Sequence, residues 1–266
     1  MELTPGLHRI GNDIVAFHLL ATDDGVTLVD AGLPGHWRAL RAELAGMGRR
    51  VEDIRGIVLT HGDSDHIGVA ERLRRDHGVP VFVHEADAAR AKGAKPPAPE
   101  PDPRRLGPLL GFAGYALRHG AARIPKLAEV VEVHDGDVLD LPGAPRIIGL
   151  PGHSPGSVAV HVPDAGALFV GDALTTRNVL TGARGAQPAP FTDDRREALA
   201  SLARLEGIEA AWVLPGHGAP WTRGVGELLR ELRSPVAERD VAGVSRAAGS
   251  RGPARSVPSS RPGRRS

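Results

Sequence analysis

The chain has 266 residues, of which 41% are hydrophobic, 24% charged and only 3% aromatic, and its formal net charge is +1. This composition is typical of a globular protein with an aliphatic core. The length fits one large domain, or one domain plus an extension, and the charge favours no class of partner. Because the chain contains no cysteine, disulfides, thiolate metal ligands and a cysteine nucleophile are excluded. Histidines and carboxylates remain as candidate metal ligands.

The first half of the sequence alternates between short apolar runs and helical patterns. We expect strands at residues 7–10, 13–20, 25–29, 54–60 and 79–83, and helices at about 36–47 and 69–77. Residues 54–60 form a compact apolar run, which is typical of a strand buried on both faces. Strands that alternate with helices in this way favour a layered α/β fold over a fold built from sheets alone.

Residues 93–126 interrupt this alternation. Six prolines between residues 96 and 108 predict an extended segment with little helix, and an apolar stretch with the only tyrosine, Tyr115, follows. Such an insert can act as a lid over a site or can be surface decoration, and both interpretations stay open. Beyond the insert we expect strands at 129–141, 145–150, 158–162, 167–170 and 211–214, and helices at about 193–205 and 227–232.

The chain is predicted to divide into a domain, residues 1–232, and a tail, residues 233–266. Beyond Val241 the tail has six arginines and no acidic residue, so we expect it to be disordered. Its charge would permit a weak contact with nucleic acid or a membrane surface, and a non-functional extension is the alternative. The sequence shows neither a membrane-spanning apolar run nor a signal-peptide pattern, so we predict a cytoplasmic protein with a small-molecule substrate and no membrane partner.

Polar side chains follow several predicted strands at the point where each strand ends. This set of histidines and aspartates comprises His61, Asp63, Asp65, His66, His153, Asp172 and His217. Strand ends are where α/β sheets place their binding crevices, and the adjacent glycines permit the tight turns that a metal site needs. Independent polar turn residues are the alternative explanation. The repeated coincidence with strand ends favours one shared metal site instead.

Five segments of the sequence, LVDAGLPG, THGDSDHIG, GHSPGS, FVGDAL and LPGHG, occur in an order and at a spacing that resemble the metallo-β-lactamase superfamily. The second segment matches the signature THxHxDHxG of that superfamily at every marked position except Asp63. The resemblance covers residues 26–218. It implies an α/β fold of the αββα type, in which two mixed β-sheets pack face to face between helices and the metal site lies along one sheet edge.

The resemblance also implies a role for each candidate residue. It implies two triads of metal ligands and one bridging ligand: His61, Asp63 and His153; Asp65, His66 and His217; and Asp172. Asp65 and Asp172 would also take part directly in catalysis. Asp30, in the LVDAGLPG segment, corresponds to a buried aspartate that supports the site loops without touching a metal.

A metal-dependent hydrolase is the function that this resemblance implies. Two divalent ions about 3.5–4 Å apart can share a hydroxide and polarise a substrate oxygen. We expect the substrate to be a small ester, lactone or thioester. Two alternatives stay open: iron-dependent redox or oxygen chemistry on the same fold, and a degenerate metal-binding module without catalysis.

Asp63 stands where the signature has its second histidine. Zinc is the expected ion, and iron or manganese are alternatives because the Asp63 oxygen is a harder ligand than an imidazole nitrogen. Two divalent ions with a bridging hydroxide and three carboxylates make a neutral cluster, whereas a histidine at position 63 would leave one positive charge. We therefore predict a less electrophilic site than the signature implies, or one that holds a more highly charged ion.

Overall fold

Two β-sheets dominate the computed structural model, which describes residues 1–99 and 102–233. Residues Met1–Leu232 form one compact unit, and the predicted tail lies outside the described residues except for Arg233. The strands are β1 (Glu2–Thr4), β2 (Leu7–Gly11), β3 (Ala16–Thr22), β4 (Gly25–Val29), β5 (Ile54–Val58), β6 (Val81–His84), β7 (Val131–Val133), β8 (Arg146–Gly149), β9 (Val158–Val162), β10 (Ala167–Gly171), β11 (Thr175–Arg177), β12 (Arg184–Gln187) and β13 (Trp212–Pro215). The α-helices are α1 (Trp37–Gly46), α2 (Ala70–His77), α3 (Ala88–Ala91), α4 (Leu106–Arg118), α5 (Arg195–Ser201) and α6 (Val225–Leu232).

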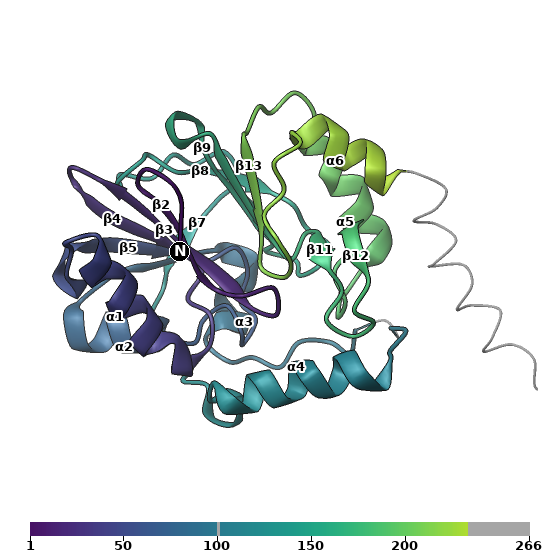
Figure 1. Ribbon diagram of the computed structural model, residues 1–266, viewed down its shortest axis with the longest axis horizontal. Coiled ribbons are helices and arrows are strands. Elements are labelled where there is room, and N and C mark those ends of the chain that lie inside the picture. Colours follow the sequence, from purple (N-terminus) through teal and green to yellow (C-terminus); the bar gives the residue numbers. More distant parts are fainter. Residues whose placement is uncertain (100–101, 234–266) are drawn as a thin grey trace, which may run out of the picture. The chain divides into compact units, whose positions relative to one another are not determined.

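Both large sheets are mixed. The first has the order β1-β2-β3-β4-β5-β6-β7 and is antiparallel up to β4 and parallel from β4 to β7. The second has the order β13-β10-β9-β8, in which only β10 and β13 pair in parallel. Figure 1 shows α1 and α2 beside the first sheet and α5 and α6 beside the second.

Three apolar clusters fill the spaces between these layers. One lies between the two sheets and joins Val58 of β5 to Phe169 of β10. A second packs the outer face of the first sheet against α1 and α2, and a third packs the second sheet against α6. In β3 the neighbours Leu19 and Leu20 belong to different clusters, as the alternating side chains of a strand require. The predicted αββα sandwich is confirmed.

Several element boundaries differ from the predictions. The strand expected at 13–20 begins at Ala16, because Asn12 caps a turn by accepting the amide hydrogen of Ile14 (2.8 Å). The strand expected at 129–141 shrinks to β7. The strands β1, β11 and β12 were not predicted, and β11 and β12 pair only with each other. These elements have three or four residues each, too few for a periodic apolar pattern to stand out.

The insert at 93–126 contains more helix than its prolines suggested. Helix α4 begins at Leu106 and includes Pro108 in its first turn, where a missing amide hydrogen leaves no intrahelical bond unmade. Backbone bonds from Arg105 to Leu180 (2.9 Å) and from Gly35 to His119 (2.8 Å) tie the segment to the domain at both ends of the helix. With 13 residues α4 is too short to cross a bilayer, and no other described helix is long and apolar enough to do so.

His36 gives the fold a pH-dependent contribution to stability. Its ring is buried, its Nδ1 accepts the amide hydrogen of Leu33 (3.0 Å), and its Nε2 bonds the Tyr115 hydroxyl (2.8 Å). Burial, with the nearby charge of His119, lowers the pKa of His36 from 6.5 to about 4. The unfolded chain therefore binds a proton at this residue between pH 6.5 and 4 while the folded chain does not, so this contribution is complete above pH 6.5 and is lost as the pH falls.

We expect the free energy of unfolding to fall by about 1 kcal/mol more in the parent than in His36→Asn between about pH 7.5 and 5.5. Asparagine does not titrate in this range, and its side-chain oxygen can take the place of Nδ1 as the acceptor for Leu33. Urea denaturation of both proteins at the two pH values measures the difference. An equal loss in both would show that His36 is not kept neutral by the fold.

Candidate metal centre

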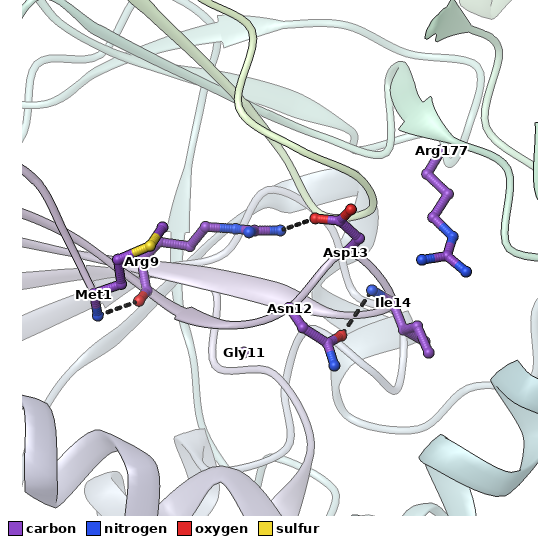
Figure 2. Close-up of a pocket in the computed structure, with 7 residues that line it drawn as sticks. All are labelled: Met1, Arg9, Gly11, Asn12, Asp13, Ile14 and Arg177. Carbon is purple, nitrogen blue, oxygen red and sulfur yellow. Dashed lines mark hydrogen bonds and ion pairs between the residues drawn. The ribbon is translucent and has the colours of Figure 1, made fainter. Parts of the chain in front are cut away.

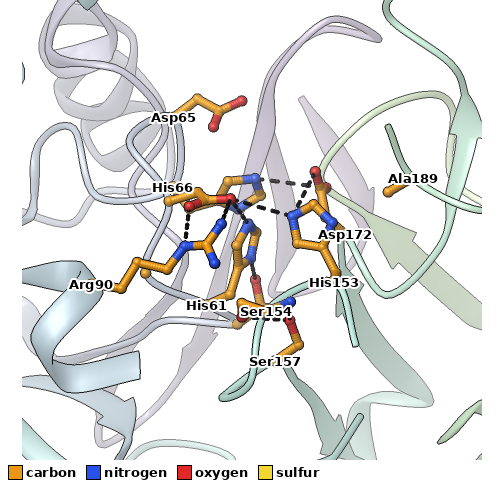
Figure 3. Close-up of polar contacts among 12 residues, drawn as sticks. His61, Asp65, His66, Arg90, His153, Ser154, Ser157, Asp172 and Ala189 are labelled. Carbon is orange, nitrogen blue, oxygen red and sulfur yellow. Dashed lines mark hydrogen bonds and ion pairs between the residues drawn. The ribbon is translucent and has the colours of Figure 1, made fainter. Parts of the chain in front are cut away.

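The seven predicted ligands lie together at one edge of the two sheets. His61 to His66 follow β5, His153 follows β8, Asp172 follows β10 and His217 follows β13. Strands β8 and β10 are both antiparallel to β9, and β13 is parallel to β10, so β8, β10 and β13 end on the same side. Figure 3 shows the His61, His66, His153 and Asp172 side chains converging from the two halves of the fold.

The candidate ligand atoms form three overlapping triads. Within each triad, the three ligand atoms lie within 4.8 Å of one another. The triads are His61–Asp63–His153, Asp65–His66–His217 and His61–His66–Asp172. The first two are those that the sequence resemblance implied. Asp172 lies between them: its Oδ2 is 3.0 Å from His217 Nε2 and 3.9 Å from His153 Nε2, and its Oδ1 is 3.7 Å from His66 Nε2.

Hydrogen bonds behind His66 and His61 orient both rings. The Asp30 Oδ2 atom accepts from His66 Nδ1 (2.9 Å). The Thr60 hydroxyl donates to the Asp30 carboxylate, so its oxygen is left to accept from His61 Nδ1 (3.0 Å). Asp30 also has a φ of 61°, a strained conformation for a non-glycine residue that such a network can hold in place. As metal ligands, both imidazoles would carry a proton on Nδ1 and present Nε2 to the site.

The rings of His153 and His217 are oriented in the same way by other segments. The Thr192 hydroxyl donates to the Ala189 carbonyl (2.8 Å), which leaves its oxygen to accept from His153 Nδ1 (3.2 Å). The carbonyl oxygen of Ile14, in the β2–β3 turn, accepts from His217 Nδ1. All four histidines therefore turn Nε2 toward the same space, in the tautomer that a metal ligand requires.

Buried polar atoms without hydrogen-bond partners show that the seven candidate ligands fit divalent cations. The Nε2 atoms of His61, His66 and His153 and the Oδ1 atom of Asp172 are buried and have no hydrogen-bond partner. Buried polar atoms are almost always satisfied, so four such atoms facing one another call for a cation. Gly216 leaves room for this convergence, because a Cβ there would lie 2.5 Å from His66 Cε1 and 2.7 Å from Asp172 Oδ1.

The carboxylates and imidazoles of the site stabilise each other's charged forms and so shift each other's pKa values. Burial raises the pKa of the Asp172 carboxyl, but the surrounding imidazoles, led by His217, outweigh it and bring the pKa well below its usual range. Burial lowers the pKa of His66, but the carboxylates of Asp30 and Asp172 outweigh it and raise the pKa to about 10. Asp172 and Asp65 likewise raise the pKa of His217 to about 9. Protons and metal ions therefore compete for the same Nε2 lone pairs.

Asp63 has a partner that the sequence did not suggest. Arg90 of α3 donates from Nε to Asp63 Oδ1 (2.5 Å) and from Nη2 to Asp63 Oδ2 (3.0 Å), and its Nη1 donates to Asp193 Oδ2 (2.7 Å). Burial raises the pKa of Asp63, but the contact with His153, the charge of His61 and the hydrogen bonds from Arg90 outweigh it and hold the pKa below its usual range. Asp63 therefore remains a carboxylate.

Asp87 ties the two halves of the first triad together. It is fully buried at the end of the turn that follows β6, and it accepts hydrogen bonds from the Gly62 amide (2.7 Å), the Ser154 hydroxyl (2.7 Å) and the Gly156 amide (2.8 Å). Sequence reasoning missed Asp87, Arg90, Thr192 and Asp193. Three charged residues within the short segment EADAARA, directly after a strand, were the available signal for Asp87 and Arg90, but nothing local indicated their partners.

The 93–126 insert contributes an aromatic rim beside the site. The Phe112 ring of α4 stands perpendicular to the His217 ring at a centroid distance of 6.3 Å, and it is 6.3 Å from the Phe191 ring. Phe191 is 41% exposed and has a φ of 62°, held where its amide donates to Asp102 (2.6 Å). A bulky residue in this conformation is strained, and such strain concentrates at binding sites.

A separate hollow of about 350 Å³ lies behind His217 and contains none of the candidate ligands. Figure 2 shows its lining residues, among them Arg9, Asp13, Ile14 and Arg177. Arg9 donates to the Gly218 carbonyl (2.7 Å) and bonds Asp13 (3.3 Å). These contacts brace the β2–β3 turn, whose Ile14 carbonyl orients His217.

Comparison with known proteins agrees with this geometry. A family model described as the metallo-beta-lactamase superfamily matches residues 10–217, so the chain belongs to that superfamily. The chain is 28% identical over 239 residues to the probable metallo-hydrolase YflN of Bacillus subtilis (strain 168), covering 83% of this chain and 87% of that protein. It is 34% identical over 182 residues to the uncharacterized protein Mb2612c of Mycobacterium bovis, covering 63% and 70% of the two chains. The superfamily match and the likeness to a probable metallo-hydrolase identify the chain as a hydrolase of this superfamily.

Solved structures show the same fold. The metallo-beta-lactamase family protein TTHA1429 of Thermus thermophilus superposes with a TM-score of 0.67 at 25% identity, covering 95% of this chain and 85% of that chain. TTHA1623, solved in a di-iron-bound form, superposes with a TM-score of 0.59 at 28% identity, covering 85% and 98%.

Proposed function

We propose that this chain is a dinuclear metallohydrolase that cleaves a small carboxylic ester, lactone or thioester. One observation carries the proposal: four histidine Nε2 atoms and three carboxylates face a single space, and each Nδ1 is bound from behind. Independent polar turn residues would not need side chains that are oriented from behind toward one buried space, whereas the ligands of a shared metal centre would. Zinc is the proposed ion, with iron or manganese as alternatives because of Asp63.

Bound divalent ions would supply Lewis acidity for a substrate carbonyl and would lower the pKa of a water molecule toward neutrality. The chain's own residues do the rest. Asp172 fixes the separation of the two triads, since it contacts members of both. Asp65, whose side chain is 18% exposed and lies 3.4 Å from His217, is placed to accept a proton from the attacking water.

The aromatic rim narrows the proposed substrate. Phe112 places apolar surface directly beside His217, and Phe191, which is 41% exposed, lies next to Phe112. An acyl group that reaches from the centre would cover part of this surface and gain about 0.8 kcal/mol for each methylene buried. We therefore propose a substrate with an apolar acyl portion.

Metal removal and a substrate panel test this function. Protein purified without added metal should contain two equivalents of metal, and complete chelation should abolish turnover of an ester, lactone and thioester panel. Zinc, iron(II) or manganese(II) should restore it. Within the panel, kcat/KM should rise with acyl chain length. Turnover that survives complete metal removal would exclude the proposed chemistry, and bound metal without turnover of any substrate would favour a binding module.

Iron-dependent redox chemistry is the second candidate. The oxygen ligand at Asp63 favours it, and so does the likeness to TTHA1623, whose structure is of a di-iron-bound form. Oxygen consumption by the iron-loaded protein with an electron donor would support this candidate. An iron-loaded sample that hydrolyses the panel and consumes no oxygen would exclude it.

A further inference from the structure

The carboxylate of Asp63 faces two ways. Both of its oxygens bind the Arg90 guanidinium, in the paired geometry that makes such contacts strong. On the other side, Asp63 Oδ2 lies 3.3 Å from His153 Nε2 and 3.6 Å from His61 Nε2. A carboxylate oxygen has two lone pairs, so Oδ2 can accept from Arg90 and still donate a lone pair into the first triad.

Arg90 is built into the site. Its side chain is 10% exposed, and Asp193, itself 11% exposed, binds the third guanidinium nitrogen. Gly62 lets α3 approach the ligand loop, because a Cβ at Gly62 would lie 2.7 Å from the Ala91 amide nitrogen and 3.1 Å from Arg90 Cβ. Arg90 therefore reaches Asp63 from a fixed direction and orients its carboxylate.

The charge of Arg90 changes the charge count of the centre. Counting ligands alone, Asp63 makes a cluster of two divalent ions and a hydroxide neutral, where a histidine would leave one positive charge. The Asp63–Arg90 pair is neutral as an imidazole is, so the pair and an imidazole contribute the same charge to the centre. Asp193, which binds the third guanidinium nitrogen of Arg90, keeps its negative charge in either case.

We propose that Asp63 and Arg90 act together as one charge-neutral ligand unit in place of a histidine, with Arg90 as the positioning residue of Asp63. This inference rests on the proposed metal centre. It makes a specific demand on mutants: a histidine at position 63 suits the first triad only if the guanidinium is removed as well. With Arg90 kept, Asp63→His makes the surroundings of the ion more positive by one charge, although Arg90 still binds Asp193.

A double-mutant cycle tests this unit through metal binding. The proteins are the parent, Asp63→His, Arg90→Met and the double variant, each checked for folding by thermal melting. Titration with zinc against a chromophoric chelator gives the stoichiometry and both dissociation constants. We expect two ions in the parent, an ion at the first triad bound about a hundredfold more weakly in Asp63→His, and recovery to about the parent value in the double variant.

A matched control removes a comparable arginine elsewhere. Arg74 contacts two carboxylates, Glu71 and Glu129, away from the centre, and Arg74→Met should leave both dissociation constants unchanged. Binding that is as tight in Asp63→His as in the double variant would overturn the proposal. So would a parent that binds one ion and gains a second in Arg90→Met, since the pair would then exclude the ion. Because binding is measured directly, failure of the substrate panel alone leaves this result intact, whereas a parent that binds no zinc removes both proposals.

Discussion

Asp172→Ala is expected to abolish hydrolysis and to release at least one metal ion per chain. The Asp172 carboxylate contacts His66, His153 and His217 and is 5% exposed, so no water or other side chain can take its place without rearrangement. Loss of partners that only support a ligand weakens metal affinity or activity about 10–100-fold. Loss of the one carboxylate shared by both triads should exceed about 100-fold.

The measurement combines kcat on the best substrate of the panel with metal content after exhaustive dialysis. Asp172→Asn keeps the shape of the side chain and removes its charge, so it should lose activity while changing the fold little. Asp164→Ala removes an exposed aspartate at the opposite end of β10 and should behave like the parent. Two retained ions and undiminished turnover in Asp172→Ala would show that this residue is not a bridging ligand.

Asp87→Ala is expected to cause the largest loss of stability. The variant leaves the Gly62 and Gly156 amides and the Ser154 hydroxyl without their buried acceptor. An unsatisfied buried donor costs about 1–3 kcal/mol, so the free energy of unfolding should fall by about 3–5 kcal/mol, a large share of the roughly 5–15 kcal/mol that is typical of a domain. Metal affinity at the first triad should fall too, because these donors belong to the loops that carry His61 and His153.

Urea denaturation of metal-free protein measures this effect without a contribution from ion binding. Ser154→Ala supplies a graded comparison: it removes one donor and leaves the two amide bonds to Asp87, so its loss should be about 1 kcal/mol. A loss in Asp87→Ala no larger than that in Ser154→Ala would mean that water or a neighbouring group satisfies the amides.

The candidate ligands were visible in the sequence because their signal is local. They follow apolar strands, and His61, His153, Asp172 and His217 each adjoin a glycine, a pattern that needs no knowledge of distant residues. Asp172 in FVGDAL and His217 in PGHGAP could therefore be selected without a structure. The short pair β11–β12 and the true start of α4 lacked such a signal, because short strands and a proline in a first turn have no distinctive periodicity.

The sequence by itself thus determined the layered α/β fold, the superfamily and the seven candidate ligands. Tertiary structure decided how those ligands are held and charged. His217 is oriented by Ile14, 203 residues away, and Arg90 joins Asp63 to Asp193, 27 and 103 residues away in the chain. These partners are set by how strands from both sheets converge at one edge, a long-range outcome of packing that no local pattern encodes. For that reason the sequence could place Asp63 in the site, but only the fold supplied the arginine that neutralises it.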